Sequence, residues 1–126
     1  MNSDNCYCGA PKKFQDCCEL YIRGIQKAPT SEALMRSRYS AYVTHEADYL
    51  LATTHFQERK HHSKTEILNW AISNQWQRLE IINTTENTVE FKAYYIDVQL
   101  RHQIHHEFSN FVFEQDSWFY VDGKFY

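Results

Sequence analysis

Four cysteines near the start of the chain are the residues whose types and spacing point most directly to chemistry. Cys6 and Cys8 are separated by one residue, and after eight further residues Cys17 and Cys18 follow as an adjacent pair. Four thiolates within so short a segment suit the tetrahedral coordination of Zn²⁺, whose structural sites are closed by four Cys or His side chains. The spacing therefore predicts a structural zinc site with all four cysteines as ligands. Lys12, Lys13 and Arg23 are expected to offset its negative charge.

Other chemistries could use the same thiols. Disulfides form in oxidising compartments, but the chain begins MNSDNCYCGA, without the basic and then apolar run of a secretory signal. A labile disulfide between Cys17 and Cys18 would make a redox pair, whereas thioredoxin-like sites use Cys-x-x-Cys in a βαβ context. Zinc is the favoured interpretation, and disulfides, a redox pair or uncoordinated thiols are the alternatives.

Composition and charge narrow the classes of protein that fit. The 126 residues are 43% hydrophobic and 16% aromatic, with a net charge of -3. This is enough apolar material for one compact domain with a small appendage. The negative charge argues against a nucleic-acid binder with a broad basic face. No segment has the ~18 apolar residues of a membrane span, so we expect a cytoplasmic protein with reduced thiols.

The part of the chain that follows the cysteines is expected to be helical. Residues 1–28 form a loop-rich module that ends before Pro29, because the residue before a proline is pushed out of the α region. Thr30 or Ser31 then caps a helix. The helical pattern covers residues 31–44, 46–52 and 64–74. The last of these follows a capping box that begins at Ser63, and we expect it to bury Ile67, Trp70 and Ala71.

The C-terminal half is expected to form an antiparallel sheet. Alternating apolar and polar residues predict strands over residues 79–84, 88–98, 99–115 and 118–121. Asp122-Gly123 has the favoured composition of a two-residue hairpin turn, so the last strand is expected to end there. Helices followed by a meander indicate the α+β class, with a module over residues 1–28 and a larger domain over 29–126.

One arginine of the first long helix is a candidate for ligand binding. At 100° per residue, Arg38 falls inside the apolar arc between Leu34 and Tyr42, whereas Arg36 lies at its margin and is expected to be exposed. A buried guanidinium must find acceptors or line a cavity, because an unpaired buried charge is costly. Pairing with a sheet carboxylate and binding of an anion are both compatible with this position.

The histidines give one further candidate. His102, His105 and His106 resemble a second metal site, but on a strand His105 points away from the other two. His55 lies between a helix and a charged loop, and histidine is the side chain best suited to acid–base chemistry near neutral pH. Arg38, Tyr39, Tyr42 and His55 are therefore the candidate polar residues of a pocket. The many aromatic residues most simply build the core, and no catalytic residue is predicted.

Two motifs resemble known families. Cys6-Tyr7-Cys8-Gly9 with Phe14-Gln15-Asp16-Cys17-Cys18 resembles the SEC-C zinc motif. That motif ends the preprotein translocase ATPase, where it contacts the export chaperone and the ribosome. The segments PTSEALMRSRYSAYV (29–43) and WFYVDG (118–123) resemble the bacterial YchJ family, in which a SEC-C motif precedes a nuclear transport factor 2-like domain. Gly9-Ala10-Pro11 replaces the usual Gly-Ser-Gly, which changes the turn but not the ligands.

The resemblance implies a cone-like domain of helices packed on a curved antiparallel sheet, and Zn²⁺ held by the four cysteines. Two hypotheses of function follow. The first is a zinc-dependent interaction module that binds a protein of the export or translation machinery, by analogy an export chaperone or the ribosome. The second is a small-molecule-binding domain or an enzyme that uses the pocket of the cone, and of the two we favour the non-enzymatic interaction module.

Overall fold

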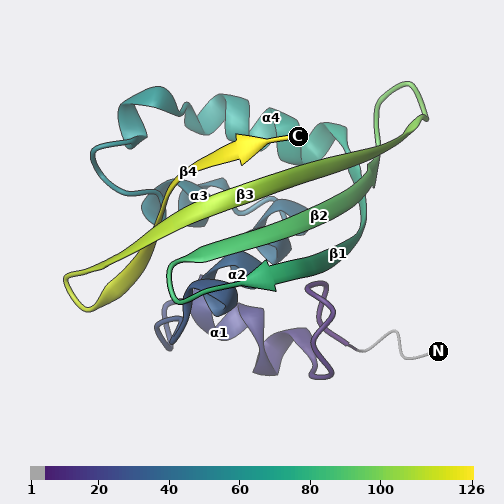
Figure 1. Cartoon of the computed structure of the whole chain (residues 1–126). Helices are drawn as coiled ribbons and strands as arrows, with labels where there is room; N and C mark the ends of the chain where they lie inside the picture. Colours follow the sequence, from purple (N-terminus) through teal and green to yellow (C-terminus); the bar gives the residue numbers. More distant parts are fainter. Residues whose placement is uncertain (1–4) are drawn as a thin grey trace.

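The structure, a computed structural model, describes residues 5–126, so the first four residues of the predicted module lie outside it. Helices precede a four-stranded antiparallel sheet, which confirms the predicted α+β class (Figure 1). The helical elements are η1 Phe14–Asp16, α1 Cys18–Ile22, α2 Ser31–Val43, α3 Ala47–Ala52, η2 Arg59–His61 and α4 Lys64–Ser73. The strands are β1 Gln75–Thr84, β2 Thr88–Ile96, β3 His102–Glu114 and β4 Ser117–Phe125. None of the helices in residues 5–126 is long and apolar enough to cross a bilayer.

The two long helices begin at hydroxyl caps. The side chain of Thr30 accepts a hydrogen bond from the amide of Ala33 at 3.0 Å, and Glu32 lies in the first turn of α2. Ser63 accepts in the same way from the amide of Glu66 at 3.3 Å, at the start of α4. These contacts satisfy amides that have no partner within their own helix. Both helices therefore begin where the sequence predicts and end within one residue of the predicted position.

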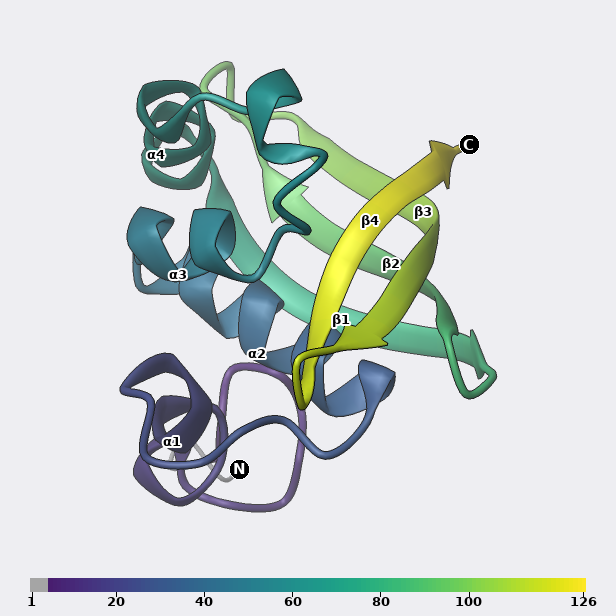
Figure 2. The same cartoon turned by 90° about the vertical axis from the view of Figure 1, so that its left-hand side faces the viewer.

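The sheet is a meander whose strands follow the order β1-β2-β3-β4, each antiparallel to the next. Register shifts interrupt the ladder in β1 and in β3, and such bulges increase the local twist and bend of a strand. The sheet curves around the helical layer, with α2, α3 and α4 on its concave side (Figure 2). Residues 5–18, called the knuckle from here on, lie with α1 beyond one end of this layer, next to α2 (Figure 1).

The position of the last turn corrects the prediction. Strand β4 continues through Asp122 and Gly123, which pair with Asn110 and Ser109 of β3. The tight turn lies earlier, between Glu114 and Ser117, where Gln115 and Asp116 have φ angles of 51° and 65°. Two successive residues with positive φ are what a type I′ hairpin requires. The backbone thus adopts the preferred hairpin turn type at Gln115-Asp116, a sequence less typical of that turn than Asp122-Gly123.

Gly123 has a packing role within β4 instead of a turn role. A Cβ atom at this position would collide with the side-chain carboxylate of Glu107 on β3. Glycine in a strand interior often marks a place where another group approaches the backbone closely. The missing side chain therefore leaves room for a buried carboxylate.

The core lies between α2 and the concave face of the sheet. Its buried residues are Leu34, Met35, Tyr39, Val89, Phe91, Ala93, Phe111 and Tyr120. In α4, Ala71 is fully buried as predicted, but Trp70 is 41% exposed, against the prediction. The reason is that Trp70 lies at the rim of the sheet, where its ring packs edge-on against Trp76 and Tyr95.

A short parallel bridge joins the helical layer to the last strand. Thr54, just after α3, pairs with Tyr120 of β4. The amide of His55 donates to the carbonyl of Tyr120 at 2.8 Å, and the amide of Tyr120 donates to the carbonyl of Thr53 at 2.8 Å. This bridge fixes the segment after α3 against the edge of the sheet.

Candidate metal centre and ligand cavity

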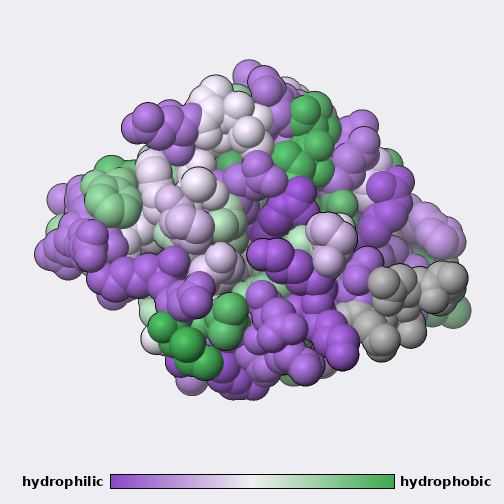
Figure 3. All heavy atoms as spheres, turned by 90° about the horizontal axis from the view of Figure 1, so that it is seen from below, coloured by the Kyte–Doolittle hydropathy of each residue, from purple (hydrophilic) through white to green (hydrophobic). Residues whose placement is uncertain are grey.

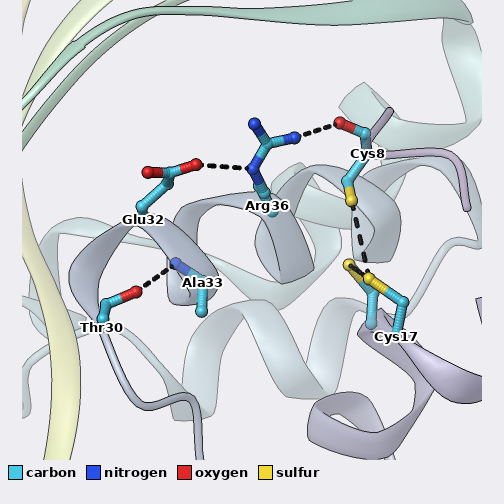
Figure 4. Close-up of polar contacts among 7 residues, drawn as sticks. Cys8, Cys17, Thr30, Glu32, Ala33 and Arg36 are labelled. Atoms are coloured by element: carbon cyan, nitrogen blue, oxygen red, sulfur yellow. Dashed lines mark hydrogen bonds and ion pairs between the residues drawn. The ribbon is translucent and has the colours of Figure 1, made fainter. Parts of the chain in front are cut away.

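The four predicted metal ligands lie together in the knuckle. The Sγ atoms of Cys6, Cys8, Cys17 and Cys18 are all within 4.8 Å of one another. The distance between Sγ atoms is 3.8 Å for Cys8 and Cys17 and 4.0 Å for Cys17 and Cys18 (Figure 4). A tetrahedral ion with metal–sulfur bonds of ~2.3 Å needs sulfur atoms about 3.8 Å apart. The donor set and its spacing therefore fit a tetrahedral thiolate site, and residues 5–126 contain no second group of this kind.

Local turns bring the two pairs of cysteines together. The amide of Gly9 donates to the carbonyl of Cys6 at 3.1 Å, and Gly9 has a φ of 91°, which suits glycine. The amide of Cys6 donates to the carbonyl of Lys12 at 2.6 Å and so closes the loop. Cys17 follows η1 and Cys18 begins α1, so the second pair is held where two short helical elements meet.

Helix α2 supports the knuckle through two side chains that the sequence pattern did not single out. Nη1 of Arg36 donates to the carbonyl of Cys8 at 2.7 Å, and its Nε donates to Glu32 at 2.9 Å (Figure 4). The Sγ atom of Cys6 lies 3.6 Å from the hydroxyl of Ser40. The prediction that Arg36 is exposed is therefore wrong. Its position at the margin of the apolar arc faces the knuckle, which covers only part of the side chain and leaves 28% of it exposed.

The side chains of the cationic residues predicted to offset the charge of the site form no hydrogen bond with the four cysteines in the described part of the chain. Lys12 and Lys13 are exposed, and neither forms an ion pair within the described part of the chain. Arg23 lies 3.5 Å from a carboxylate oxygen of Glu19 and 3.4 Å from one of Glu46. Arg36 is thus the basic side chain that contacts the cysteine segment directly.

Electrostatics favour a cation among the four sulfur atoms. Burial, together with negative charge on Cys8 and Cys6, raises the pKa of Cys17 to about 12. Hydrogen bonding between Cys18 and Cys6 raises the pKa of Cys18 and lowers the pKa of Cys6. A metal-free cluster therefore keeps some of its thiols protonated at neutral pH. A divalent cation is what allows all of them to be thiolates at once.

A second candidate site is a cavity of about 160 Å³ between the helices and the concave face of the sheet. Its buried inner wall is largely apolar, and the polar groups on it include Arg38, Glu107, Ser109 and the hydroxyl of Tyr120. Its exposed wall is formed by His62, Trp70 and Phe125. The other lining residues are Met35, Tyr39, Tyr42, Thr54, Ile67, Trp76, Phe91, Ala93 and His105. The cavity is therefore mostly apolar, with a few polar groups on its buried inner wall and aromatic side chains at its exposed end.

Arg38 lies at the inner wall and is only 6% exposed. Its Nη1 donates to the carbonyl of Leu50 at 2.8 Å and to the hydroxyl of Thr53 at 2.7 Å. The guanidinium carbon lies 4.5 Å from the centroid of the Tyr120 ring, a distance typical of a cation–π contact. The acceptors of Arg38 thus come from α3 and the residues after it, and not from a carboxylate of the sheet.

Glu107 of β3 is the buried carboxylate of the cavity. One of its oxygens accepts from the hydroxyls of Ser109 and Tyr120, both at 2.7 Å, and the other lies 2.8 Å from Nε2 of His105. Burial alone would raise the pKa of Glu107, but these three hydrogen bonds together lower it below the ordinary value of 4.5. The carboxylate is therefore charged at neutral pH. The sequence analysis did not predict this residue.

The four predicted pocket residues do not all meet. Arg38, Tyr39 and Tyr42 line the cavity, because they follow one another around the sheet-facing side of α2. His55 is not among the lining residues. Its Nε2 lies 2.8 Å from a carboxylate oxygen of Glu114, and its ring packs against Phe56 with centroids 4.6 Å apart. The parallel bridge after α3 holds His55 at the edge of the sheet, outside the cavity wall.

Comparisons with known proteins agree with this architecture. Residues 30–123 match the family described as YchJ, middle NTF2-like domain. A UPF0225 protein of Geobacter sulfurreducens is 42% identical over 125 residues, which cover 94% of this chain and 77% of that protein. A UPF0225 protein of Photorhabdus laumondii is 40% identical over 125 residues, with 94% and 79% covered.

Two solved structures have the same fold. The solution structure of a SEC-C motif containing protein from Rhodopseudomonas palustris superimposes with a TM-score of 0.87 at 31% identity, covering 95% of this chain and 97% of that one. The crystal structure of a SEC-C motif containing protein from Psychrobacter arcticus gives a TM-score of 0.80 at 31% identity, covering 97% and 81%. The fold and the cysteine cluster thus define a SEC-C motif protein with a nuclear transport factor 2-like domain. The chain belongs to the YchJ-like family, also described as UPF0225, and this confirms the predicted family and fold.

Proposed function

We propose that the four cysteines bind one Zn²⁺ ion, and that the knuckle is the site at which a protein of the export or translation machinery binds. The observation that supports the metal is the set of four sulfur atoms within 4.8 Å of one another. Four thiolates form a soft donor set, which suits zinc in a tetrahedral site. Bound in this way, zinc supplies a cross-link between the turn at Cys6–Cys8 and the start of α1, and no open coordination position for a reaction.

The surface of the knuckle supports the partner role. Tyr7 is 49% exposed while its ring packs edge-on against Phe14, so an aromatic side chain is presented in a fixed position. Lys12 and Lys13 are exposed on the same knuckle, which suits a partner with acidic groups. The face that includes α1 and the knuckle is mostly hydrophilic, with small separate apolar patches (Figure 3). A surface of this kind suits a transient, polar interface.

Metal analysis tests the first part of the proposal. Protein purified under reducing conditions without added metal is expected to contain one zinc per chain, and Co²⁺ substitution should give the absorption of a tetrahedral thiolate site. The Cys8→Ser variant should bind zinc much more weakly. Protein that folds fully and contains no zinc would contradict the proposal.

Binding to defined partners tests the second part. Purified bacterial export chaperone and purified ribosomes are the probes, because both are contacted by the SEC-C motif that this knuckle resembles. Tyr7→Ala should weaken binding, whereas Leu100→Ala, an exposed residue (74%) on the β2–β3 connection, should not. His55→Ala should also leave binding unchanged, since His55 lies away from the knuckle. Equal binding by the Tyr7 and Leu100 variants, or no binding to either probe, would refute the interaction role.

The cavity favours a second function, which is the binding of a small molecule inside the NTF2-like domain. An engineered apolar cavity of ~150 Å³ holds benzene, so a cavity of about 160 Å³ has room for one ring. Ligand pockets are mostly apolar and carry a few convergent polar groups, as this cavity does. Ala93→Leu, which would fill the cavity from β2, should abolish binding of any such ligand. Unchanged binding in this variant would place the ligand elsewhere.

A further inference from the structure

We propose that the cavity binds a small carboxylate with one apolar ring or short chain, its acid group against Arg38 and Tyr42 and its apolar body against Trp70 and Trp76. This inference rests on the ligand-binding function proposed for the cavity and names the chemical class of the ligand. It is independent of the metal centre and of any partner of the knuckle.

Two nitrogens of the Arg38 guanidinium form no hydrogen bond to the described residues. All hydrogen bonds of this guanidinium within residues 5–126 are made by Nη1, to Leu50, Thr53 and Thr54. No fully buried side-chain nitrogen or oxygen in the same residues lacks a hydrogen-bond partner. Nε and Nη2 therefore reach open space, and because the residue is 94% buried and lines the cavity, that space is the cavity. A guanidinium with two free donors is the protein group that best matches a carboxylate.

Two tyrosine side chains lie beside Arg38 in the lining of the cavity. Tyr42 and Tyr39 both line the cavity, and neither hydroxyl forms a hydrogen bond to any of the described residues. Burial raises the pKa of Tyr39, and burial together with the charge of Glu107 raises the pKa of Tyr42 despite the opposing effect of Arg38. Both hydroxyls therefore keep their protons and can donate. They extend the set of donors that Arg38 begins.

Glu107 and His62 are two further ionisable groups in the cavity lining. Both oxygens of Glu107 are already occupied by Ser109, Tyr120 and His105, so this carboxylate has little capacity to bind a cation. Burial, with the charge of Arg38, lowers the pKa of His62, which is consequently neutral at neutral pH. The inner wall carries the negative charge of Glu107 as well as the positive charge of Arg38, but the groups on it that are free to bond are donors. A ligand that brings acceptors fits these groups, which favours acids over amines.

Two tryptophans provide an aromatic surface for the apolar body of the ligand. Trp70 and Trp76 pack edge-on with ring centroids 5.9 Å apart, and both line the cavity. Trp70 is partly exposed, so the aromatic wall continues to the outer end. A volume of about 160 Å³ accommodates a single ring or a short branched chain. The ligand therefore enters with its acid group first and leaves its apolar part between the tryptophans and the sheet.

The experiment compares two probes of nearly the same shape, phenylacetate and phenylacetamide, by calorimetry and by the NMR signals of the indole groups. Phenylacetate should bind about tenfold more tightly, because a hydrogen bond between two charged groups is roughly twice as strong as a neutral one. Tyr42→Phe, which removes only a hydroxyl, should weaken binding of phenylacetate roughly threefold to tenfold. Tyr94→Phe, on the outside of the sheet and bonded to Glu80, is the matched control and should change nothing.

The possible results test separately the chemical class of the ligand, the cavity as its site and the position of its acid group. If phenylacetamide binds as tightly as phenylacetate, the carboxylate class is wrong, although small-molecule binding in the cavity stands. If neither probe binds the wild type, or if both bind the filled variant Ala93→Leu as tightly as they bind the wild type, the proposed ligand-binding function of the cavity is wrong as well. If phenylacetate binds but Tyr42→Phe and Arg38→Gln, each checked to be folded by NMR, bind it as the wild type does, the acid group lies elsewhere and the inference is overturned.

Discussion

Two arginines that are separated by one residue on α2 serve different parts of the molecule. Arg36 reaches the carbonyl of Cys8 in the knuckle, and Arg38 lies at the inner wall of the cavity. An α-helix turns 100° per residue, so the side chains of two residues that are two positions apart point in nearly opposite directions. The helix therefore presents one cationic side chain to each candidate site.

Replacing each arginine by leucine should affect different properties. Arg38→Leu should lower the free energy of unfolding by about 1.5–3 kcal/mol, the value of a hydrogen bond to a charged group. Arg36→Leu should change the unfolding free energy less, but should speed the loss of zinc to a chelator, because it releases the segment that carries Cys8. Urea unfolding and the rate of chelator-induced metal release measure the two effects. Indistinguishable results for both variants would contradict the assignment of the two faces.

The buried carboxylate of Glu107 should make part of the stability depend on pH. Because its pKa is lower in the folded protein than the ordinary value of 4.5, Glu107 contributes stability above that value and loses it as the pH falls below it. Glu107→Gln should therefore be less stable than the wild type at pH 7, and the difference should shrink as the pH falls through 4.5 and below. Urea unfolding at a series of pH values measures this difference, and the metal centre, common to both proteins, cancels from it. A difference that grows on acidification would contradict the lowered pKa.

The residues of the two candidate sites can be predicted from the sequence to different degrees. The clustering of the cysteines is predictable because their type and spacing are typical of a metal site, and the positions of Arg38, Tyr39 and Tyr42 on one side of α2 are predictable from helical phase. Glu107 is one of two acidic residues in β3, and its inward position depends on the register of that strand. No local pattern in the sequence encodes that register.

At the scale of elements, the helix starts are predictable and the strand ends are not. Thr30 and Ser63 cap their helices through contacts within three residues, and such local contacts can be inferred from sequence. The last hairpin depends instead on distant packing. The composition of Asp122-Gly123 favours a turn at these two residues. Glu107, however, occupies the space beside Gly123, which therefore stays within β4, and the turn lies at Gln115-Asp116 instead.

Two glycine substitutions should therefore have opposite effects. Asp116→Gly should stabilise the protein by about 0.4–1 kcal/mol, because Asp116 has a φ of 65° and glycine adopts such angles without strain. Gly123→Ala should destabilise it by about 1–3 kcal/mol, since the added methyl group displaces the carboxylate of Glu107. Chemical unfolding of the two variants tests this pair. Destabilisation by Asp116→Gly together with tolerance of Gly123→Ala would instead support a turn at residues 122–123.

The contacts between the knuckle and α2 define how far loss of zinc should spread. Cys6 contacts Ser40, and Leu79 of β1 packs against the cysteine cluster. Removing zinc with a chelator should abolish hydrogen-exchange protection in the knuckle and reduce it in α2, while β2 and β3 stay protected. Metal coordination supplies most of the folding energy of such small modules, of the order of 10 kcal/mol in zinc-finger peptides. Equal loss of protection throughout the sheet would mean that the knuckle and the sheet unfold as one unit.

At the scale of the whole molecule, the class of fold follows from the order of its elements. Helical periodicity followed by alternating strands predicts a meander covered by helices, and the structure has this arrangement. The cavity could not be predicted in the same way. Its volume depends on how side chains from α2, α4 and all four strands pack, and a change of one methylene group is enough to alter such a space.

The bridge between Thr54 and Tyr120 has a consequence for the rate of folding. Each strand of the meander pairs with its neighbour in the chain, whereas this bridge joins residues 66 positions apart (120 − 54 = 66). Closing so long a loop costs conformational entropy before the contacts of the bridge can form and offset that cost. We therefore expect the hairpins to form before the bridge. Thr54→Ala should then mainly accelerate unfolding, and Val89→Ala, in the core of β2, should mainly slow refolding. Stopped-flow measurements over a range of urea concentrations separate the two rates, and slower refolding of the Thr54 variant would place the bridge early on the pathway.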